Sequence, residues 1–419
     1  VVFDDELAVA AGDAVARDAQ VALGGAPDDE TIALHGDLDL RPVTLEQYKR
    51  GLHADHTLRR ESRGPERGPL PMAHNTALPI LRQRGTPQTA RAALGDAPAR
   101  GHAQGAVRGG AGPARSLYVH VPFCFHKCHY CDFYSIVDTR DRQEAFTQRL
   151  VRELRALAPW AAGAPLRTIF VGGGTPSLLR VDLWERVLAA LGEYFDLSLI
   201  RRAGAATGAA RDTNEAGRER EAEFTVECNP ETVTPALMGA LRGGGVTRVS
   251  VGAQSFDPRH LKTLERWHDP ANVHRALEMA RGADIPRASI DLIYAIPGQT
   301  LEDLDANLRT ALGTGLGPEG GLGLSHLSAY SLTYEPNTAM TARLKRGDFA
   351  PAPEDLEVEM LGLLLERTRG AGLERYEVSN FARRGEESVH NLAYWRQEQW
   401  LAAGPSASGH VAGHRWKNA

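Results

Sequence analysis

The chain has 419 residues, of which 42% are hydrophobic and 24% are charged, and its formal net charge is −5. A mildly acidic chain lacks the concentrated basic surface that general nucleic-acid binding needs, so we expect no nucleic-acid partner. No apolar run reaches about 18 residues, which excludes a predicted transmembrane helix, and the acidic start Asp4–Glu6 is unlike a secretory signal peptide. The length allows one large domain or two of medium size.

Residues 1–115 are predicted to form a low-complexity, disordered extension. Only Phe3 and Tyr48 are aromatic there, and Arg, Ala, Gly and Pro dominate stretches such as 100–115. Such a segment buries too little apolar surface to offset the entropy lost on ordering. Short helices near Glu6–Leu23 are also compatible with the sequence. Because the chain starts at Val1 without a Met, we expect part of this stretch to be a fragment or to follow a doubtful translation start.

From Ser116 onward, β-rich runs alternate with amphipathic helical segments. This alternation predicts an α/β fold with a parallel sheet and right-handed crossovers. Six such units favour a partial (β/α)6 TIM-like barrel over residues 116–343, and an open doubly wound sheet is the alternative. The predicted strands are Leu117–Val121, Thr168–Val171, Phe224–Glu227, Arg248–Gly252, Ala288–Ile293 and His326–Ser331. Helical spacing is clearest in Phe146, Leu150, Leu154 and Leu157, and in Leu183, Val187, Leu188 and Leu191.

Two polar or glycine-rich stretches interrupt this pattern. Arg201–Ala222 is predicted to be a surface insertion in one crossover, and Gly315–Gly323 a flexible loop. Residues 344–419 form a C-terminal region with a predicted helix at about Pro353–Thr368, followed by an aromatic-rich stretch.

Three of the four cysteines, Cys124, Cys128 and Cys131, fall within eight residues directly after the first predicted strand. This crowding does not suit a disulfide scaffold and indicates metal or redox chemistry in a reducing compartment, so we expect a cytoplasmic protein. The spacing C-x3-C-x2-C gathers three thiolates, which can hold three irons of a [4Fe–4S] cluster and leave the fourth iron open.

Zinc is the alternative metal for this segment, because His120, His126 and His129 lie beside the cysteines. A structural zinc site takes two close pairs of ligands. No second pair follows here, since Cys228 is the only other cysteine, and its alternation with Glu227 predicts that it packs in the core.

Several polar or glycine-rich motifs stand at the ends of predicted strands, where parallel barrels build their sites. Gly172–Pro176 follows the second strand, and its glycines let backbone approach a ligand closely, although a plain turn would also explain them. Glu227 ends the third strand and Gln254 the fourth. Asp291 lies inside the otherwise apolar fifth strand, so it needs a partner or a role, and an ion pair with Arg266 is one possibility.

The segment from Cys124 to Phe133, with these motifs in order, resembles the radical S-adenosylmethionine (SAM) superfamily over about Ser116 to the C-terminus. The group it is most similar to contains oxygen-independent coproporphyrinogen III oxidase and the haem chaperone HemW. The resemblance implies a [4Fe–4S] cluster on the three cysteines and SAM on its open iron. A reductant such as flavodoxin or ferredoxin would drive cleavage of SAM to a carbon radical. The resemblance implies SAM contacts for Tyr118, Tyr130, Gly174, Thr175, Pro176, Glu227, Gln254, Arg266 and Asp291, core packing being the alternative for the two tyrosines, and it assigns no catalytic residue.

Two features favour the HemW branch. The oxidase carries a further cysteine where this chain has Phe133, and His390-Asn391-Leu-Ala-Tyr394-Trp395 matches a HemW motif linked to haem. Imidazole can ligate haem iron and aromatic rings can cover a porphyrin, so the resemblance implies haem contacts for His390, Tyr394 and Trp395. We therefore expect a haem chaperone, monomeric or homodimeric, that passes haem to an acceptor protein. The alternatives are the oxidase, another radical SAM enzyme, and a non-catalytic zinc or interaction protein.

The chain departs from this group at three places. Ala295 stands where relatives usually have Gly, Ser408 where they usually have His, and the chain ends at Ala419, before the small C-terminal domain that the group normally carries. We therefore expect a truncated C-terminal domain and impaired haem delivery or partner docking, with a complete SAM site.

Overall fold

The computed structural model describes residues 112–205, 222–313 and 321–419, all within the compact unit Pro79–Ala419. The predicted N-terminal extension up to residue 111, the helices near Glu6–Leu23, most of the insertion and most of the glycine-rich loop lie outside the described residues. No helix in the described ranges has the length and apolar character needed to cross a membrane.

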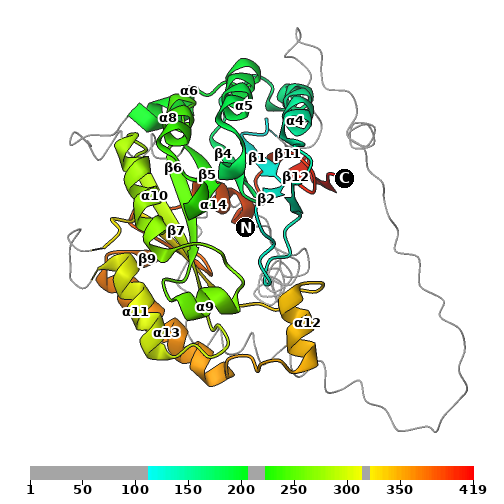
Figure 1. The fold of residues 1–419 in the computed structure, drawn as a ribbon. Coiled ribbons are helices and arrows are strands. Elements are labelled where there is room, and N and C mark those ends of the chain that lie inside the picture. Colours follow the sequence, from blue (N-terminus) through cyan, green and yellow to red (C-terminus); the bar gives the residue numbers. More distant parts are fainter. Residues whose placement is uncertain (1–111, 206–221, 314–320) are drawn as a thin grey trace, which may run out of the picture. The chain divides into compact units, whose positions relative to one another are not determined.

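One eleven-stranded sheet forms the core, in the order β13-β12-β11-β1-β4-β5-β6-β7-β8-β10-β9 (Figure 1). Its six central strands are parallel and confirm the six predicted strands to within two residues at each end. They are β1 (Ser116–Val121), β4 (Thr168–Gly173), β5 (Glu223–Cys228), β6 (Arg248–Gln254), β7 (Arg287–Tyr294) and β8 (His326–Ser331).

The strand order distinguishes the two predicted architectures. From β1 to β8 the parallel strands follow one another in chain order, with no reversal. A doubly wound sheet reverses its order at a switch point, whereas right-handed crossovers in a constant direction place every helix on one face. The register also slips, since Thr168 pairs with Glu223 but Thr225 pairs with Arg248, and such stagger accompanies the strand tilt of a barrel. The arc stays open, so the barrel is partial.

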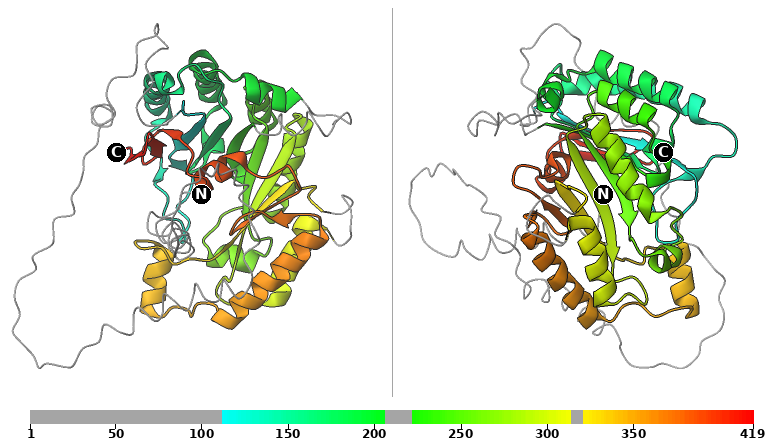
Figure 2. Two further views of the ribbon diagram at one scale, coloured as in Figure 1. Left: turned by 180° about the vertical axis from the view of Figure 1, so that it is seen from behind. Right: turned by 60° about the vertical axis from the view of Figure 1, so that its left-hand side comes forward.

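The helices follow their local sequence signals and surround the strands (Figure 2). The predicted apolar stripe of α4 buries Leu150 and Leu154. At the start of α11 the Thr300 hydroxyl and the Asp303 carboxylate cap each other's backbone N–H groups. The helices are α4 (Gln143–Leu157), α5 (Val181–Tyr194), α6 (Ser198–Ala205), α8 (Pro235–Gly243), α9 (Pro258–Thr263), α10 (Pro270–Gly282), α11 (Leu301–Leu312), α12 (Ala339–Arg346), α13 (Glu354–Gly370) and α14 (Val389–Trp395).

The C-terminal region extends both edges of the sheet. After β8 the chain adds β10 antiparallel to β8, crosses the open side of the arc through α14, and adds β11 parallel to β1 (Figure 1). The sequence did not predict these short strands. They are β9 (Glu374–Arg375), β10 (Asn380–Ala382), β11 (Trp400–Ala403), β12 (Ser408–Val411) and β13 (His414–Lys417), and a separate parallel pair is formed by β2 (Phe123–Cys124) and β3 (Ile136–Val137).

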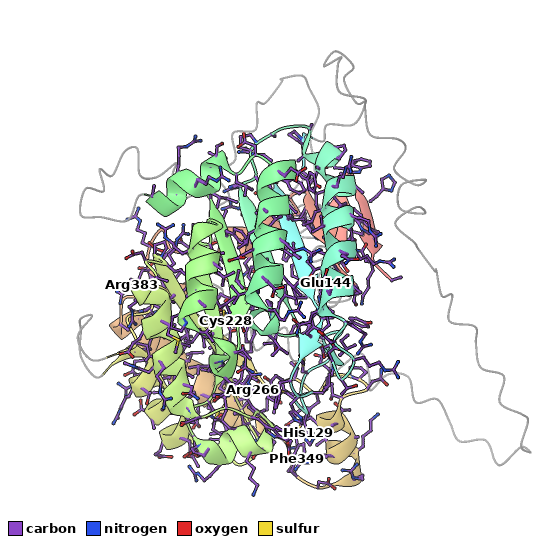
Figure 3. The ribbon with its side chains drawn as sticks, turned by 45° about the horizontal axis from the view of Figure 1, so that its top comes forward. His129, Glu144, Cys228, Arg266, Phe349 and Arg383 are labelled. Carbon is purple, nitrogen blue, oxygen red and sulfur yellow. The ribbon has the colours of Figure 1, made fainter. Side chains whose placement is uncertain are left out.

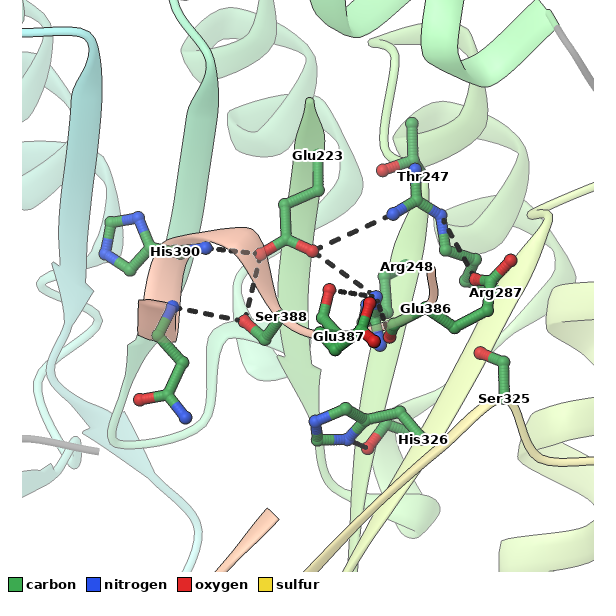
Figure 4. Close-up of polar contacts among 12 residues, drawn as sticks. Glu223, Thr247, Arg248, Arg287, Ser325, His326, Glu386, Glu387, Ser388 and His390 are labelled. Atoms are coloured by element: carbon green, nitrogen blue, oxygen red, sulfur yellow. Dashed lines mark hydrogen bonds and ion pairs between the residues drawn. The ribbon is translucent and has the colours of Figure 1, made fainter. Parts of the chain in front are cut away.

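A buried polar cluster around Glu223, here called the barrel floor, closes the amino end of the barrel (Figure 4). Glu223, Arg248 and Arg287 are the first residues of three neighbouring strands. Glu223 is fully buried, and its Oε2 lies 3.4 Å from Arg248 Nη2 and 3.8 Å from Arg287 Nη1. Its Oε1 accepts hydrogen bonds from Ser388 Oγ at 2.9 Å and from the His390 backbone N–H at 2.8 Å. One carboxylate therefore joins three strands to the segment that enters α14.

We expect Glu223→Ala to lower the free energy of unfolding by about 3–5 kcal/mol, because it removes the buried carboxylate that pairs with Arg248 and one of the two carboxylates beside Arg287. Urea denaturation followed by circular dichroism measures the change. Glu185→Ala, which removes an exposed carboxylate from α5, is the control and should change the free energy by less than about 0.5 kcal/mol. Equal stability of the two variants would contradict this account of the barrel floor.

Ala295, which departs from the related group, lies just after β7 with a φ of +58°. This is the left-handed region, where a Cβ costs about 1–2 kcal/mol and glycine is favoured. The backbone conformation at this position thus explains why a glycine is usual there. In this chain an alanine adopts the same conformation, with strain.

Candidate functional site

The three clustered cysteines lie on one loop beyond the carboxyl ends of the strands. Cys124 ends β2, and Cys128 and Cys131 follow in the loop, where the Cys131 N–H donates to the Cys128 carbonyl at 3.3 Å. All three thiols are free. Thr175 Oγ1 lies 3.6 Å from Cys124 Sγ, and Arg266 Nη1 lies 3.7 Å from Cys128 Sγ. The loop thus presents its thiols to a hydroxyl and to a cation from two other strand ends.

Neighbouring segments hold this loop in place. The His129 N–H donates to the Leu264 carbonyl at 3.2 Å, and the His129 carbonyl accepts from the Met340 N–H at 2.9 Å. Tyr130 packs against a hydrophobic cluster that includes Leu264, Met340 and Ile296. Figure 3 shows His129 and Arg266 on the same side of the molecule, near α12. These backbone hydrogen bonds and apolar contacts position the loop.

The chemistry of the thiols fits an iron–sulfur centre. Burial raises the pKa of the Cys124 thiol, and it raises the pKa of Cys131 to about 11. Metal ligation requires thiolates. Burial disfavours their negative charge, and the positive charge of an iron centre and of the Arg266 guanidinium would offset that cost.

A single zinc ion fits less well. Zn–S bonds of about 2.3 Å would draw tetrahedral sulfurs to within roughly 4 Å of one another. Among the described residues, the side chains gathered closely enough for a single ion are Asp257, His260 and Asp303, and the cysteines are not in that group. Arg259 already pairs with both aspartates, at 2.5 and 2.6 Å. The three cysteine sulfurs are thus not gathered around one point in this conformation.

His120, the first histidine of the zinc alternative, has partners on both ring nitrogens. Nε2 lies 2.7 Å from the Tyr134 carbonyl oxygen, and Nδ1 lies 3.1 Å from the Tyr118 hydroxyl. A carbonyl only accepts, so Nε2 carries the proton and Nδ1 accepts from Tyr118. His120 therefore positions Tyr118 and Tyr134.

The turn Gly172–Pro176 brings the end of β4 to the cysteine loop. A Cβ on Gly172 would lie 2.7 Å from Glu227 Oε2, and one on Gly174 would lie 2.7 Å from the Phe123 carbonyl oxygen. The Gly173 N–H donates to Glu227 Oε2 at 3.1 Å. The glycines are thus needed for close approach, which a plain turn would not require, and they place Thr175 beside Cys124.

The polar residues at the other strand ends converge on the same end of the barrel. Asp291 accepts a hydrogen bond from Ser250 Oγ at 3.1 Å. Arg266 Nη2 donates to the Gly252 carbonyl at 3.0 Å, and its buried Nε has no hydrogen-bond partner within the described residues. The suggested ion pair between Arg266 and Asp291 is absent from the described part of the chain. An unsatisfied guanidinium N–H next to a thiol is a donor available to an anionic ligand group.

Gln254 stands at a distortion of β6. Its φ is +61°, and the pairing with β7 shifts between Gly252 and Gln254. A bulge of this kind redirects a side chain at a strand end, and such bulges are common beside active sites.

Glu227 makes the stability of the SAM-free protein depend on pH. Burial raises its pKa from 4.5 to about 7. The unfolded chain loses the proton first as the pH rises, so this contribution to stability is complete below pH 4.5 and is lost as the pH approaches 7. We expect the urea midpoint to fall between these two pH values in the wild type, and to fall less in Glu227→Gln. Glu185→Gln is the exposed control, and an unchanged pH dependence in Glu227→Gln would contradict the prediction.

The residues predicted to contact haem lie at the other end of the barrel. His390 Nδ1 is 2.7 Å from Oγ1 of Thr168, the first residue of β4, and Nε2 is 2.9 Å from the Tyr394 hydroxyl. Burial lowers the His390 pKa to about 3, so the ring is neutral. Cys124, by contrast, contacts Thr175, just beyond the end of β4. One strand of six residues, ~17 Å, separates the two places.

Tyr394 and Trp395 also have internal partners. The Tyr394 ring packs edge-on against Trp400, with a centroid separation of 4.6 Å. Trp395 Nε1 donates to Glu377 Oε2 at 3.0 Å, and its ring is 40% exposed. In this conformation the motif holds α14 against the barrel floor, and haem ligation by His390 stays a prediction.

The radical SAM superfamily model matches residues 118–311. The heme chaperone HemW of Lactococcus lactis subsp. lactis is 35% identical over 303 residues, covering 72% of this chain and 71% of that protein. The heme chaperone HemW of Escherichia coli is 33% identical over 300 residues, 71% of each chain. The chain belongs to the HemW family of radical SAM proteins. Membership implies a [4Fe–4S] cluster and SAM at the site.

Among solved structures, the radical SAM coproporphyrinogen III oxidase HemN of Escherichia coli has a TM-score of 0.57. It is 23% identical and the match covers 72% of this chain and 66% of that chain. This likeness shows a shared fold and confirms the partial barrel that the strand order indicates.

Proposed function

We propose that the protein is a haem chaperone that binds a [4Fe–4S] cluster, SAM and haem, and transfers haem to an acceptor protein. Its similarity to proteins named heme chaperone, at 32–35% identity over about 72% of the chain, carries this proposal. The cysteine loop supports the cluster assignment. Three thiols share one loop, with a hydroxyl and a guanidinium beside two of them.

In this proposal Cys124, Cys128 and Cys131 hold the cluster. When bound together, the cluster and SAM supply reductive cleavage chemistry, with electrons from a carrier such as flavodoxin or ferredoxin. The protein supplies position and charge. Arg266 offers an N–H to an anionic group of SAM and stabilises the thiolate of Cys128, and Tyr130 covers the loop with an apolar ring.

The remaining proposed SAM contacts come from the strand ends. The half-buried carboxyl groups of Glu227 and Asp291 can accept hydrogen bonds from ligand hydroxyl or amino groups, and Gln254 supplies an amide. Gly174, Thr175 and Pro176 form the turn beside Cys124, and Tyr118 packs beneath, buried on β1.

Haem is the proposed cargo, with His390, Tyr394 and Trp395 as contacts derived from the resemblance. Ligation through His390 would require the ring to leave the Thr168 or Tyr394 hydroxyl. We propose a monomer or homodimer acting in the cytoplasm, since thiolate ligation of a cluster suits a reducing compartment.

Anaerobically reconstituted protein given SAM and reductant should take up about one haem per chain and form no decarboxylated product from coproporphyrinogen III. Haem uptake is measured by optical titration, and decarboxylation by mass spectrometry of the porphyrin products. An acceptor-free sample should retain its haem through gel filtration. Repeated turnover of coproporphyrinogen III would instead establish the oxidase, and absence of haem binding would refute the chaperone.

A further inference from the structure

A histidine inside the cysteine loop forms a second candidate contact for haem. We propose that His126, oriented by Glu265 and Trp267, is an axial ligand for haem iron on the surface beside the cluster. This inference rests on the proposed function, because it identifies where the haem cargo is held.

Three side chains from two segments build this site. The imidazole of His126 stacks face to face on the Trp267 indole, with centroids 4.0 Å apart and planes 6° from parallel. Glu265 Oε2 accepts the Trp267 Nε1–H at 2.8 Å and lies 3.6 Å from His126 Nε2. The carboxylate thus fixes the indole, and the indole fixes the plane of the imidazole.

The two ring nitrogens of His126 lie in different surroundings. Nε2 is buried and faces the Glu265 carboxylate, which leaves Nδ1 as the nitrogen open to a metal. Histidine ligands of metals typically turn one ring N–H toward a carboxylate while the other nitrogen binds the metal. The side chain is 25% exposed, so the ring is reachable from solvent.

Two exposed aromatic side chains neighbour the imidazole, since Phe125 precedes His126 in the chain and Trp267 stacks on it. Phe125 and Trp267, which are 70% and 58% exposed, are the most exposed large hydrophobic side chains in the described part of the chain. Large exposed aromatic side chains close to one imidazole are consistent with a binding surface. Their flat faces suit a porphyrin, which is itself a large apolar disc with a metal at its centre.

The other described histidines lack this combination. His390 and His326 are buried, and each has both ring nitrogens within 2.9 Å of a hydroxyl oxygen. His274 is exposed and faces the Glu278 carboxylate at 3.3 Å, but no ring contact is found for it. His274 therefore matches His126 in its carboxylate neighbour and differs in its aromatic platform.

Titration of ferric haem into the reconstituted full chain, read by optical absorption and by electron paramagnetic resonance (EPR) of the haem, tests the site. We expect His126→Ala to lose the spectrum of imidazole-ligated ferric haem, and Glu265→Ala to weaken binding about 10-fold. His274→Ala should behave as the wild type. Iron content of the cluster, measured before haem is added, verifies that each variant is folded and loaded.

Added imidazole provides an independent check, since it should restore the ligated spectrum in His126→Ala. The inference is overturned if His126→Ala keeps the wild-type spectrum and affinity, or if His390→Ala alone removes them in a folded, cluster-loaded protein. If the wild type binds no haem, the proposed function itself fails and this inference fails with it.

Discussion

The fold depends on a buried carboxylate, Glu223, at the amino end of the barrel. Its charge is compensated by Arg248 and Arg287, the first residues of the next two strands, and by N–H and hydroxyl donors from the segment 388–390. Leaving any of these charges unpaired costs several kcal/mol. The barrel floor therefore fixes the relative positions of β5, β6 and β7. It also holds the C-terminal segment in place across the open side of the barrel.

The site at the opposite end follows from this register. Side chains alternate along a strand, so Glu223 and Glu227 point to the same side of β5, and Arg287 and Asp291 to the same side of β7. Once the floor is fixed, the polar groups at the other end are brought together beneath the cysteine loop. The loop adds its thiols beside Thr175 and Arg266, which come from two different strand ends. The proposed cluster ligands and the proposed SAM contacts thus lie together at this end of the barrel.

Much of this was predictable from the sequence, because the six parallel strands, of six to eight residues each, contain apolar, β-branched runs bounded by clear turns. The convergence of Gly174, Glu227 and Asp291 followed from parallel topology. The strands from β9 to β13 have two to four residues each and gain their order from pairing with distant edges, which no local pattern reveals. For the same reason the sequence did not show that Arg266 bonds to Gly252 rather than pairing with Asp291, or that Trp267 stacks on His126.

His390 illustrates the limit of motif interpretation. The motif suggested an imidazole open to iron, whereas the contacts with Thr168 and Tyr394 occupy both ring nitrogens. Thr168 lies 222 residues before His390, so only the folded chain brings these two together, whereas Tyr394 lies one helical turn further along α14. In this conformation the His390 motif serves packing, and its contact with haem stays a prediction.

The central claim is that the three cysteines and the adjoining strand ends form one cluster site that accepts SAM. EPR of the reduced, reconstituted protein before and after addition of SAM tests it most directly, with Cys128→Ala and Cys228→Ala as paired variants, since Cys228 is a buried core thiol outside the loop. We predict a reduced [4Fe–4S] signal whose shape changes with SAM in the wild type and in Cys228→Ala, and loss of that signal in Cys128→Ala. An identical signal in all three proteins, unaffected by SAM, would contradict the account.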